Sequence, residues 1–167
     1  MRIMTEQTAP FAGHSETVQA EWIDWNGHMN VAYYMLVFDH ATDALLEHAG
    51  LGEAYVKDSG NSVFVAEAHV TYEREVMEGD RLRATTQVLD LDAKRLHILH
   101  RMYSGDGDDL AATNELMILH MDMRERRSAP FPEMQMRSLE QIFERHQALE
   151  RPAQAGRVIG IRRNPTQ

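Results

Sequence analysis

Helical periodicity in one long apolar stretch constrains the fold of this 167-residue chain more than any other feature of its sequence. The stretch begins at Asn30, and its apolar side chains recur at the three- and four-residue spacing of an α-helix. These positions are Val31, Met35, Phe38, Ala41, Leu45 and Ala49. Further apolar residues flank them, so the helix is apolar over most of its circumference. Gly50 and Gly52 mark its end, and we expect such a helix to be buried.

Segments with the two-residue alternation of β-strands lie on both sides of this helix. One segment, Ser15–Ile23, precedes the helix and places Val18, Ala20 and Trp22 on one face. Four more follow the helix, at Ser62–Arg74, Arg81–Leu91, Arg95–Tyr103 and Leu110–Met123. The turns between these four contain Gly79, Ala93 and Gly105, and they are short enough to make neighbouring strands sequential hairpins.

The order of these elements predicts an α+β protein in which an antiparallel five-stranded sheet wraps around one long central helix. Pro130 and Pro132 end the sheet, and Ser138–Leu149 has the pattern of a C-terminal amphipathic helix. We expect a flexible N-terminal segment over residues 1–14, one domain over residues 15–129, and a helix with a basic tail over residues 130–167. One sheet and one helix leave an edge uncovered, which favours a homodimer or a tetramer.

Charge and composition exclude several classes of function. The 26 acidic and 17 basic residues give a formal net charge of −9, the wrong sign for a nucleic-acid-binding protein. The absence of cysteine removes thiolate nucleophiles and iron–sulfur clusters. The longest unbroken apolar run, Val31–Phe38, is far shorter than the ~20 residues that a membrane span needs. We therefore expect a cytoplasmic protein that binds neither nucleic acid nor membrane.

The loop before the central helix holds the residues best suited to chemistry. It brings the carboxylate of Asp24, the imidazole of His28 and the carboxamide of Asn30 to the helix start. Backbone N–H groups at a helix start carry partial positive charge and can receive a carbonyl oxygen. A carboxylate nearby can activate water or attack an acyl carbon. A structural interpretation stays open, because Asp and Asn routinely cap turns and helices.

The string Asp24-x-x-Gly27-His28-x-Asn30-x-x-x-Tyr34, placed between a strand and a long helix, resembles the motif of hotdog-fold thioesterases of the 4-hydroxybenzoyl-CoA thioesterase type. The order of elements from Thr17 to Met123 is also similar to that family. The resemblance implies acyl-CoA hydrolysis without a metal or another cofactor, by dimers with active sites at the subunit interface. It also implies that Asp24 acts as nucleophile or general base.

The same resemblance assigns roles to the start of the helix. Backbone N–H groups near Val31 would hold the thioester oxygen, while His28 and Asn30 orient the acyl group or shape the loop. The sequence departs from a frequent form of the motif, because Val31 stands where a second asparagine often follows Asn30. This difference removes a polar side chain but keeps the backbone donor, so it bears on acyl specificity more than on the reaction.

Aromatic residues crowd the expected site. Trp25, Tyr33 and Tyr34, together with Trp22, could hold a quaternary ammonium group by cation–π attraction. The motif neighbourhood and the segment from Arg126 to Pro132 are similar to thioesterases of bacterial carnitine breakdown, which act on betainyl-CoA. Packing in the core or at a dimer interface is the alternative role for these aromatic residues.

Three further side chains are candidates for substrate binding. Arg126 and Arg127 could contact the phosphates of CoA, although a solvated charged turn explains them too. Glu67 lies in the middle of a predicted strand and could be contributed by a partner subunit, or could form an intersubunit ion pair.

Two other functions remain as alternatives to hydrolysis. They are a non-catalytic module that binds acyl-CoA and a hotdog dehydratase. The carboxylate of Asp24 argues against the module, because a protein that only binds a thioester does not need a negative charge beside the carbonyl carbon.

Overall fold

The computed structural model describes residues 9–161 and residue 163. Its helices are α1 (Val31–His48), α2 (Glu53–Ser59) and α3 (Glu133–His146), with one 3-10 turn, η1 (Ala20–Trp22). Its strands are β1 (Phe11–Thr17), β2 (Asn61–Tyr72), β3 (Arg81–Leu91), β4 (Arg95–Ser104), β5 (Leu110–Asp122) and β6 (Arg127–Ser128). None of the helices in the described ranges is long and apolar enough to cross a membrane.

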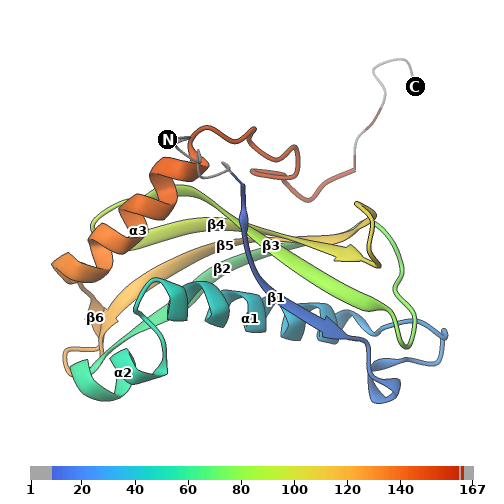
Figure 1. Ribbon diagram of the computed structural model, residues 1–167, viewed down its shortest axis with the longest axis horizontal. Helices are drawn as coiled ribbons and strands as arrows, with labels where there is room; N and C mark the ends of the chain where they lie inside the picture. The colour runs from blue at the N-terminus through green and yellow to red at the C-terminus, as the bar shows by residue number, and fades with distance from the viewer. Residues whose placement is uncertain (1–8, 162, 164–167) are drawn as a thin grey trace, which may run out of the picture.

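The strands form one antiparallel sheet that curls over α1 (Figure 1). Their order is β1-β3-β4-β5-β2, and the two-residue strand β6 pairs with β5. The expected α+β class and the long central helix are therefore confirmed. The short sixth strand, β6, was not predicted, because its two residues are too few to show an alternating pattern. Strands β1 and β2 form the two edges of the main order.

The prediction of sequential hairpins holds for two turns and is wrong for the third. Strand β3 pairs with β4, and β4 with β5, but β2 pairs with β5 instead of β3. Residues 73–80 therefore cross the end of the sheet, from the edge strand β2 to β3, which lies next to the opposite edge strand β1. The N–H groups of Glu73 and Arg74 both donate to the carbonyl of Ala111, and Val76 is fully buried, so these contacts fix the crossing.

Helix α1 is buried on one side, against the sheet. Val37, Phe38 and Leu45 have no exposed surface. Val31, Met35 and Leu36 on the rest of the helix are exposed, so the expectation of a wholly surrounded helix is wrong for a single copy of the chain.

A buried histidine fixes α1 to the sheet. His100 of β4 contacts Thr42 of α1 through Nε2 at 2.9 Å and Thr86 of β3 through Nδ1 at 2.8 Å. The Thr42 hydroxyl donates its single hydrogen to the carbonyl of Phe38, so Nε2 must be the protonated nitrogen and Nδ1 accepts from Thr86. Burial lowers the pKa of His100 to about 3, which keeps the ring neutral.

The segment before α1 differs from the predicted strand Ser15–Ile23. The strand runs earlier, over Phe11–Thr17, so residues 11–14 belong to the sheet and not to a flexible segment, while residues 1–8 lie outside the described part. The apparent alternation came from η1, in which Trp22 is buried but Ala20 is exposed. Val18 and Trp22, four residues apart, are both buried, and in the sequence this spacing looks like one face of a strand.

The C-terminal part also shifts from its predicted bounds. The helix α3 starts at Glu133, directly after Pro132, and not at Ser138. Its residues Leu139 and Ile142 join the core beside the end of α1. The chain then crosses the outer face of the sheet, where Gln87 donates to the carbonyl of Glu150.

Candidate active site

A tight loop holds Asp24 at the entrance to α1. Ile23 and Met29 form an isolated antiparallel bridge, and the N–H of Asp24 donates to the carbonyl of His28 at 3.0 Å. Gly27 adopts φ +84°, a left-handed conformation that favours glycine. The Asp24 carboxylate accepts from the N–H of Asn26 at 2.8 Å, so one oxygen is fixed within the loop.

The first turn of α1 keeps one backbone donor free. Asn30 caps the helix, because its side-chain oxygen accepts from the N–H of Ala32 at 3.0 Å. The N–H of Tyr33 donates to the Asn30 carbonyl. Among the described residues, the N–H of Val31 has no hydrogen-bond partner, and its side chain is 58% exposed. An acyl oxygen can therefore reach this donor at the positive end of the helix.

The aromatic residues lie in three different settings. The rings of Trp22 and Tyr33 stack on each other, with centroids 5.3 Å apart. Tyr34 is buried against Tyr72, and its hydroxyl donates to the carbonyl of Arg74 at 3.3 Å. Trp25 is 94% exposed at the tip of the loop. Within one described copy of the chain, these rings do not surround a common space.

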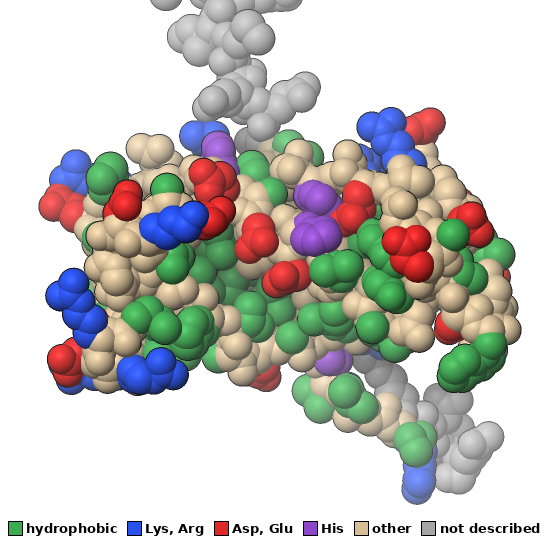
Figure 2. All heavy atoms as spheres, turned by 90° about the horizontal axis from the view of Figure 1, so that it is seen from below, with side chains coloured by type: hydrophobic (Ala, Val, Ile, Leu, Met, Phe, Trp, Pro, Cys, Tyr) green, Lys and Arg blue, Asp and Glu red, His purple; other side chains and the backbone are tan. Residues whose placement is uncertain are grey.

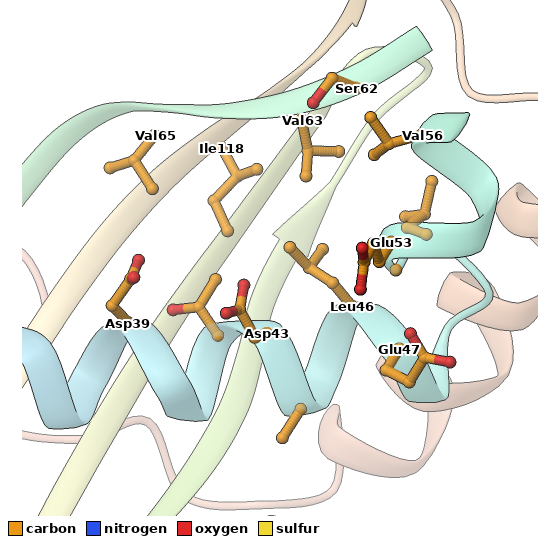
Figure 3. A pocket seen from close by; sticks show the side chains of 14 residues that line it. Asp39, Asp43, Leu46, Glu47, Glu53, Val56, Ser62, Val63, Val65 and Ile118 are labelled. Carbon is orange, nitrogen blue, oxygen red and sulfur yellow. The ribbon is translucent and has the colours of Figure 1, made fainter. Parts of the chain in front are cut away.

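A groove lies between α1, α2 and the first half of β2 (Figure 3). Its volume is about 680 Å³, which is the size of a small-molecule site. Val63 and Val65 of β2 and Ile118 of β5 form its apolar wall, and they face α1 across the opening. Figure 2 shows apolar side chains recessed on this face, with acidic side chains around them.

The helix side of this groove is acidic. Asp39 and Asp43, one turn apart on α1, point into the space below β2 (Figure 3). Burial raises the pKa of Asp43, and the negative charge of Asp39 raises it further. Both residues are still exposed in one copy of the chain, so the two carboxylates repel each other at the rim of the groove, and a cation between them would relieve this repulsion.

The sequence did not single out these two acids. Their signal was the i, i+4 spacing of carboxylates on a helix that is otherwise apolar, but a charged pair on a helix usually marks a solvated face. Only the curvature of the sheet shows that this face lines a groove.

The remaining predicted site residues lie away from Asp24. Glu67 is exposed on β2, directly after an irregularity in its pairing with β5. Arg126 and Arg127 are exposed, and β6, which begins at Arg127, lies beside α2 at the opposite end of α1 from the Asp24 loop (Figure 1). Arg126 has φ +49° in a turn that the carboxylate of Asp122 closes. One copy of the chain thus does not bring the arginines to the carboxylate.

Comparisons with known proteins agree with this fold. Residues 18–139 match the family model of the thioesterase-like superfamily. The betainyl-CoA thioesterase of Pseudomonas aeruginosa is 44% identical over 144 residues, which is 86% of this chain and 91% of that protein. A protein of Rhizobium meliloti named L-carnitine dehydrogenase/betainyl-CoA thioesterase is 38% identical over 87% of this chain and 29% of its own length.

A comparison with solved structures also finds a protein with the same fold. A Staphylococcus aureus protein in complex with CoA has a TM-score of 0.84 and 32% identity, and the match covers 92% of this chain and 99% of that one. The expected hotdog fold is therefore confirmed, and so is the expected class of enzyme, a thioester hydrolase. The family model covers most of the sequence, including the Asp24 loop and the whole of α1, and the chain belongs to the thioesterase-like superfamily.

Proposed function

We propose that this protein hydrolyses a small acyl-CoA thioester whose acyl group carries a quaternary ammonium, as in betainyl-CoA, at sites shared between two copies of the chain. The observation that carries the proposal is the separation of the site into two halves. Asp24 and the free N–H of Val31 lie at one end of α1, whereas the acidic groove lies towards the other. The name of the Pseudomonas aeruginosa relative supports the same substrate.

Strand β2 is the element that can join the two halves. From Phe64 to Ala68 every residue is exposed, so both faces and the outer edge of this stretch are open. An open apolar edge of this kind pairs readily with another strand. We infer that two copies pair through β2 in antiparallel fashion, which gives a homodimer with one continuous sheet.

Antiparallel pairing has a direct consequence for the site. Val63 and Val65, in the first half of β2, line the groove. The Asp24 loop lies at the other end of β2. Tyr34 packs on Tyr72 there, and the N–H of Met29 donates to the carbonyl of Val76. Reversal of β2 in the second copy brings its Asp24 loop towards the groove of the first. Association of two such dimers into a tetramer is compatible with this arrangement.

The chemistry then needs few groups. The N–H of Val31 stabilises the oxyanion that forms when the thioester carbonyl is attacked. In one route Asp24 removes a proton from the attacking water, the carbon–sulfur bond breaks, and the proton passes to the departing CoA thiolate. In the other route Asp24 attacks the carbonyl carbon, CoA leaves as the thiolate, and water then hydrolyses the resulting anhydride to the free acid and the Asp24 carboxylate. Arg126 and Arg127 lie at the same end of the molecule as the groove, where they can bind the CoA phosphates. A cytoplasmic location goes with this substrate.

The acyl group of betainyl-CoA fits the charge of the groove. Its trimethylammonium is a cation with an apolar surface, and the groove combines Val63, Val65 and Ile118 with the carboxylates of Asp39 and Asp43. We propose this acidic groove as the acyl site. Tyr33 and Trp25 would approach the substrate from the partner's Asp24 loop.

The test is release of CoA thiol from betainyl-CoA and from its neutral isostere, 3,3-dimethylbutanoyl-CoA. The wild-type protein is expected to prefer the charged substrate, and Asp24→Asn to reduce kcat by about 100-fold or more, because general-base catalysis contributes at least that much. His28→Gln and, as a matched loop variant, Asn26→Ala are assayed with the same two substrates.

Each outcome separates the alternatives. Turnover of the neutral isostere alone would keep the hydrolase and reject the cationic acyl group. Full activity of a folded Asp24→Asn protein would reject the assigned mechanism. Tight CoA binding with no thiol release from any substrate would favour the non-catalytic module.

A further inference from the structure

Three side chains outside the proposed reaction converge between β1 and α1. His14 and Glu16 lie two residues apart on β1 and so share one face of the strand, and His40 comes from α1. His14 Nε2 lies 2.6 Å from Glu16 Oε1, and His40 Nδ1 lies 2.8 Å from the same oxygen. The two imidazole rings meet edge to face, with centroids 5.4 Å apart.

The donor set is one that divalent transition metals bind. Two imidazole nitrogens and one carboxylate oxygen lie within 4.8 Å of one another. Zn²⁺ takes such ligands at about 2.0–2.2 Å, and two histidines with one glutamate form a known zinc set. Ligand atoms of a tetrahedral ion are roughly 3.3 Å apart. For the ion to enter, the His14 nitrogen therefore needs to move away from Glu16 Oε1 by about 0.7 Å and the His40 nitrogen by about 0.5 Å.

The surroundings suit a partly shielded ion. The side chains of His14 and Glu16 are 21% and 19% exposed, and that of His40 is 39% exposed. The protein thus supplies three ligands on the inner side, while water can fill a fourth position. Figure 2 shows histidine atoms beside acidic side chains near the middle of the face seen from below.

We propose that His14, Glu16 and His40 form a binding site for a divalent transition-metal ion, with Zn²⁺ as the expected occupant. The ligands come from an edge strand, β1, which pairs only with β3, and from the central helix. A bound ion cross-links these two elements. Its expected effect is on the stability of this edge of the sheet, and the thioesterase reaction does not depend on it.

The chain offers a matched control. His97 Nε2 lies 2.7 Å from Glu115 Oε1, and the two side chains are 21% and 15% exposed, close to the burial of His14 and Glu16. Within the described residues this pair has no third ligand at metal-binding distance. A histidine–glutamate contact alone is therefore present at both places, and only the first has a complete donor set.

The experiment uses untagged, chelator-treated full-length protein and zinc chloride. Bound zinc after equilibrium dialysis is measured by elemental analysis, and Tm is measured with and without the metal. The wild-type protein and His97→Gln are expected to bind one zinc ion per chain. Zinc at about one hundred times its dissociation constant should raise their Tm by roughly 5–10 °C. His40→Gln and Glu16→Gln are expected to lose both effects.

Cobalt(II) gives a second measurement, because its visible absorption changes when imidazole and carboxylate ligands replace water. The wild-type spectrum should change on binding, and that of Glu16→Gln should not. Glu16→Gln preserves the size of the side chain and keeps an oxygen that can accept from both histidines, so it distinguishes metal binding from a merely structural cluster. Absence of zinc binding by the wild type, or equal binding by both site variants, would overturn the proposal.

Discussion

In the proposed acyl site, Asp43 is the residue whose charge bears most directly on the choice of substrate. It lies one turn from Asp39, and both carboxylates face the apolar wall of the groove. Burial, followed by the charge of Asp39, raises its pKa. A cationic acyl group neutralises this pair, whereas a neutral group of the same shape leaves the repulsion in place.

Replacing Asp43 by Asn should therefore change selectivity more than catalysis. We expect kcat/KM for betainyl-CoA to fall about 10-fold, equivalent to ~1.4 kcal/mol, while that for 3,3-dimethylbutanoyl-CoA stays the same or rises. Glu53→Gln is the control, because Glu53 also lines the groove but already pairs with Lys57. An equal loss for both substrates in Asp43→Asn would contradict a role in recognising charge.

At the scale of elements, the start of α1 combines a structural and a chemical function. Asn30 accepts from the N–H of Ala32 and so leaves the N–H of Val31 as the free donor. Asn30→Ala should lower the free energy of unfolding by about 1 kcal/mol, the usual value of a helix cap, and Asn30→Ser should restore most of it. Denaturant unfolding measures the change, with Asn26→Ala as the control because the Asn26 side chain makes no hydrogen bond among the described residues. No loss in Asn30→Ala would show that the cap contributes nothing.

The elements that the sequence predicted well are those in which local pattern and tertiary position agree. The bounds of β3 match the prediction, and α1 begins one residue after the predicted start, because apolar spacing and Asn30 act together there. Helix α2 was missed: it has only seven residues and no buried side chain, so it has no apolar period to detect. The pairing of β2 with β5 was missed because a short turn sequence does not reveal a crossing.

The same distinction applies to the site. Asp24, His28 and Asn30 lie within seven residues of one another in the sequence, and a sequence motif can therefore identify them. The groove joins residues from α1, α2, β2 and β5, which no linear pattern connects. The cluster of His14, Glu16 and His40 was missed for another reason. The first strand was predicted to begin at Ser15, so its alternating pattern did not include His14.

At the scale of the whole molecule, the proposed dimer makes completion of the site depend on the open edge of β2. Phe64 is 41% exposed, and it lies on the face of β2 opposite the groove-lining residues Val63 and Val65. A charge at this position should hinder pairing of two β2 strands without touching the groove.

We therefore expect Phe64→Arg to shift the protein from dimer to monomer in sedimentation and to abolish most of the thioesterase activity, because the two halves of the site separate. Met134→Arg is the matched control, since Met134 is an exposed apolar residue on α3, away from β2. A Phe64→Arg monomer with full activity would show that one copy of the chain contains the complete site.

The route of the chain after α3 has a consequence for how this domain can be tethered. The described residues after α3 run over the outer side of the curled sheet (Figure 1), where Gln87 donates to the carbonyl of Glu150. A second domain that continued from this segment on the same side would leave β2 and the groove accessible. The Rhizobium meliloti relative is named for two activities, and this chain matches 29% of its length.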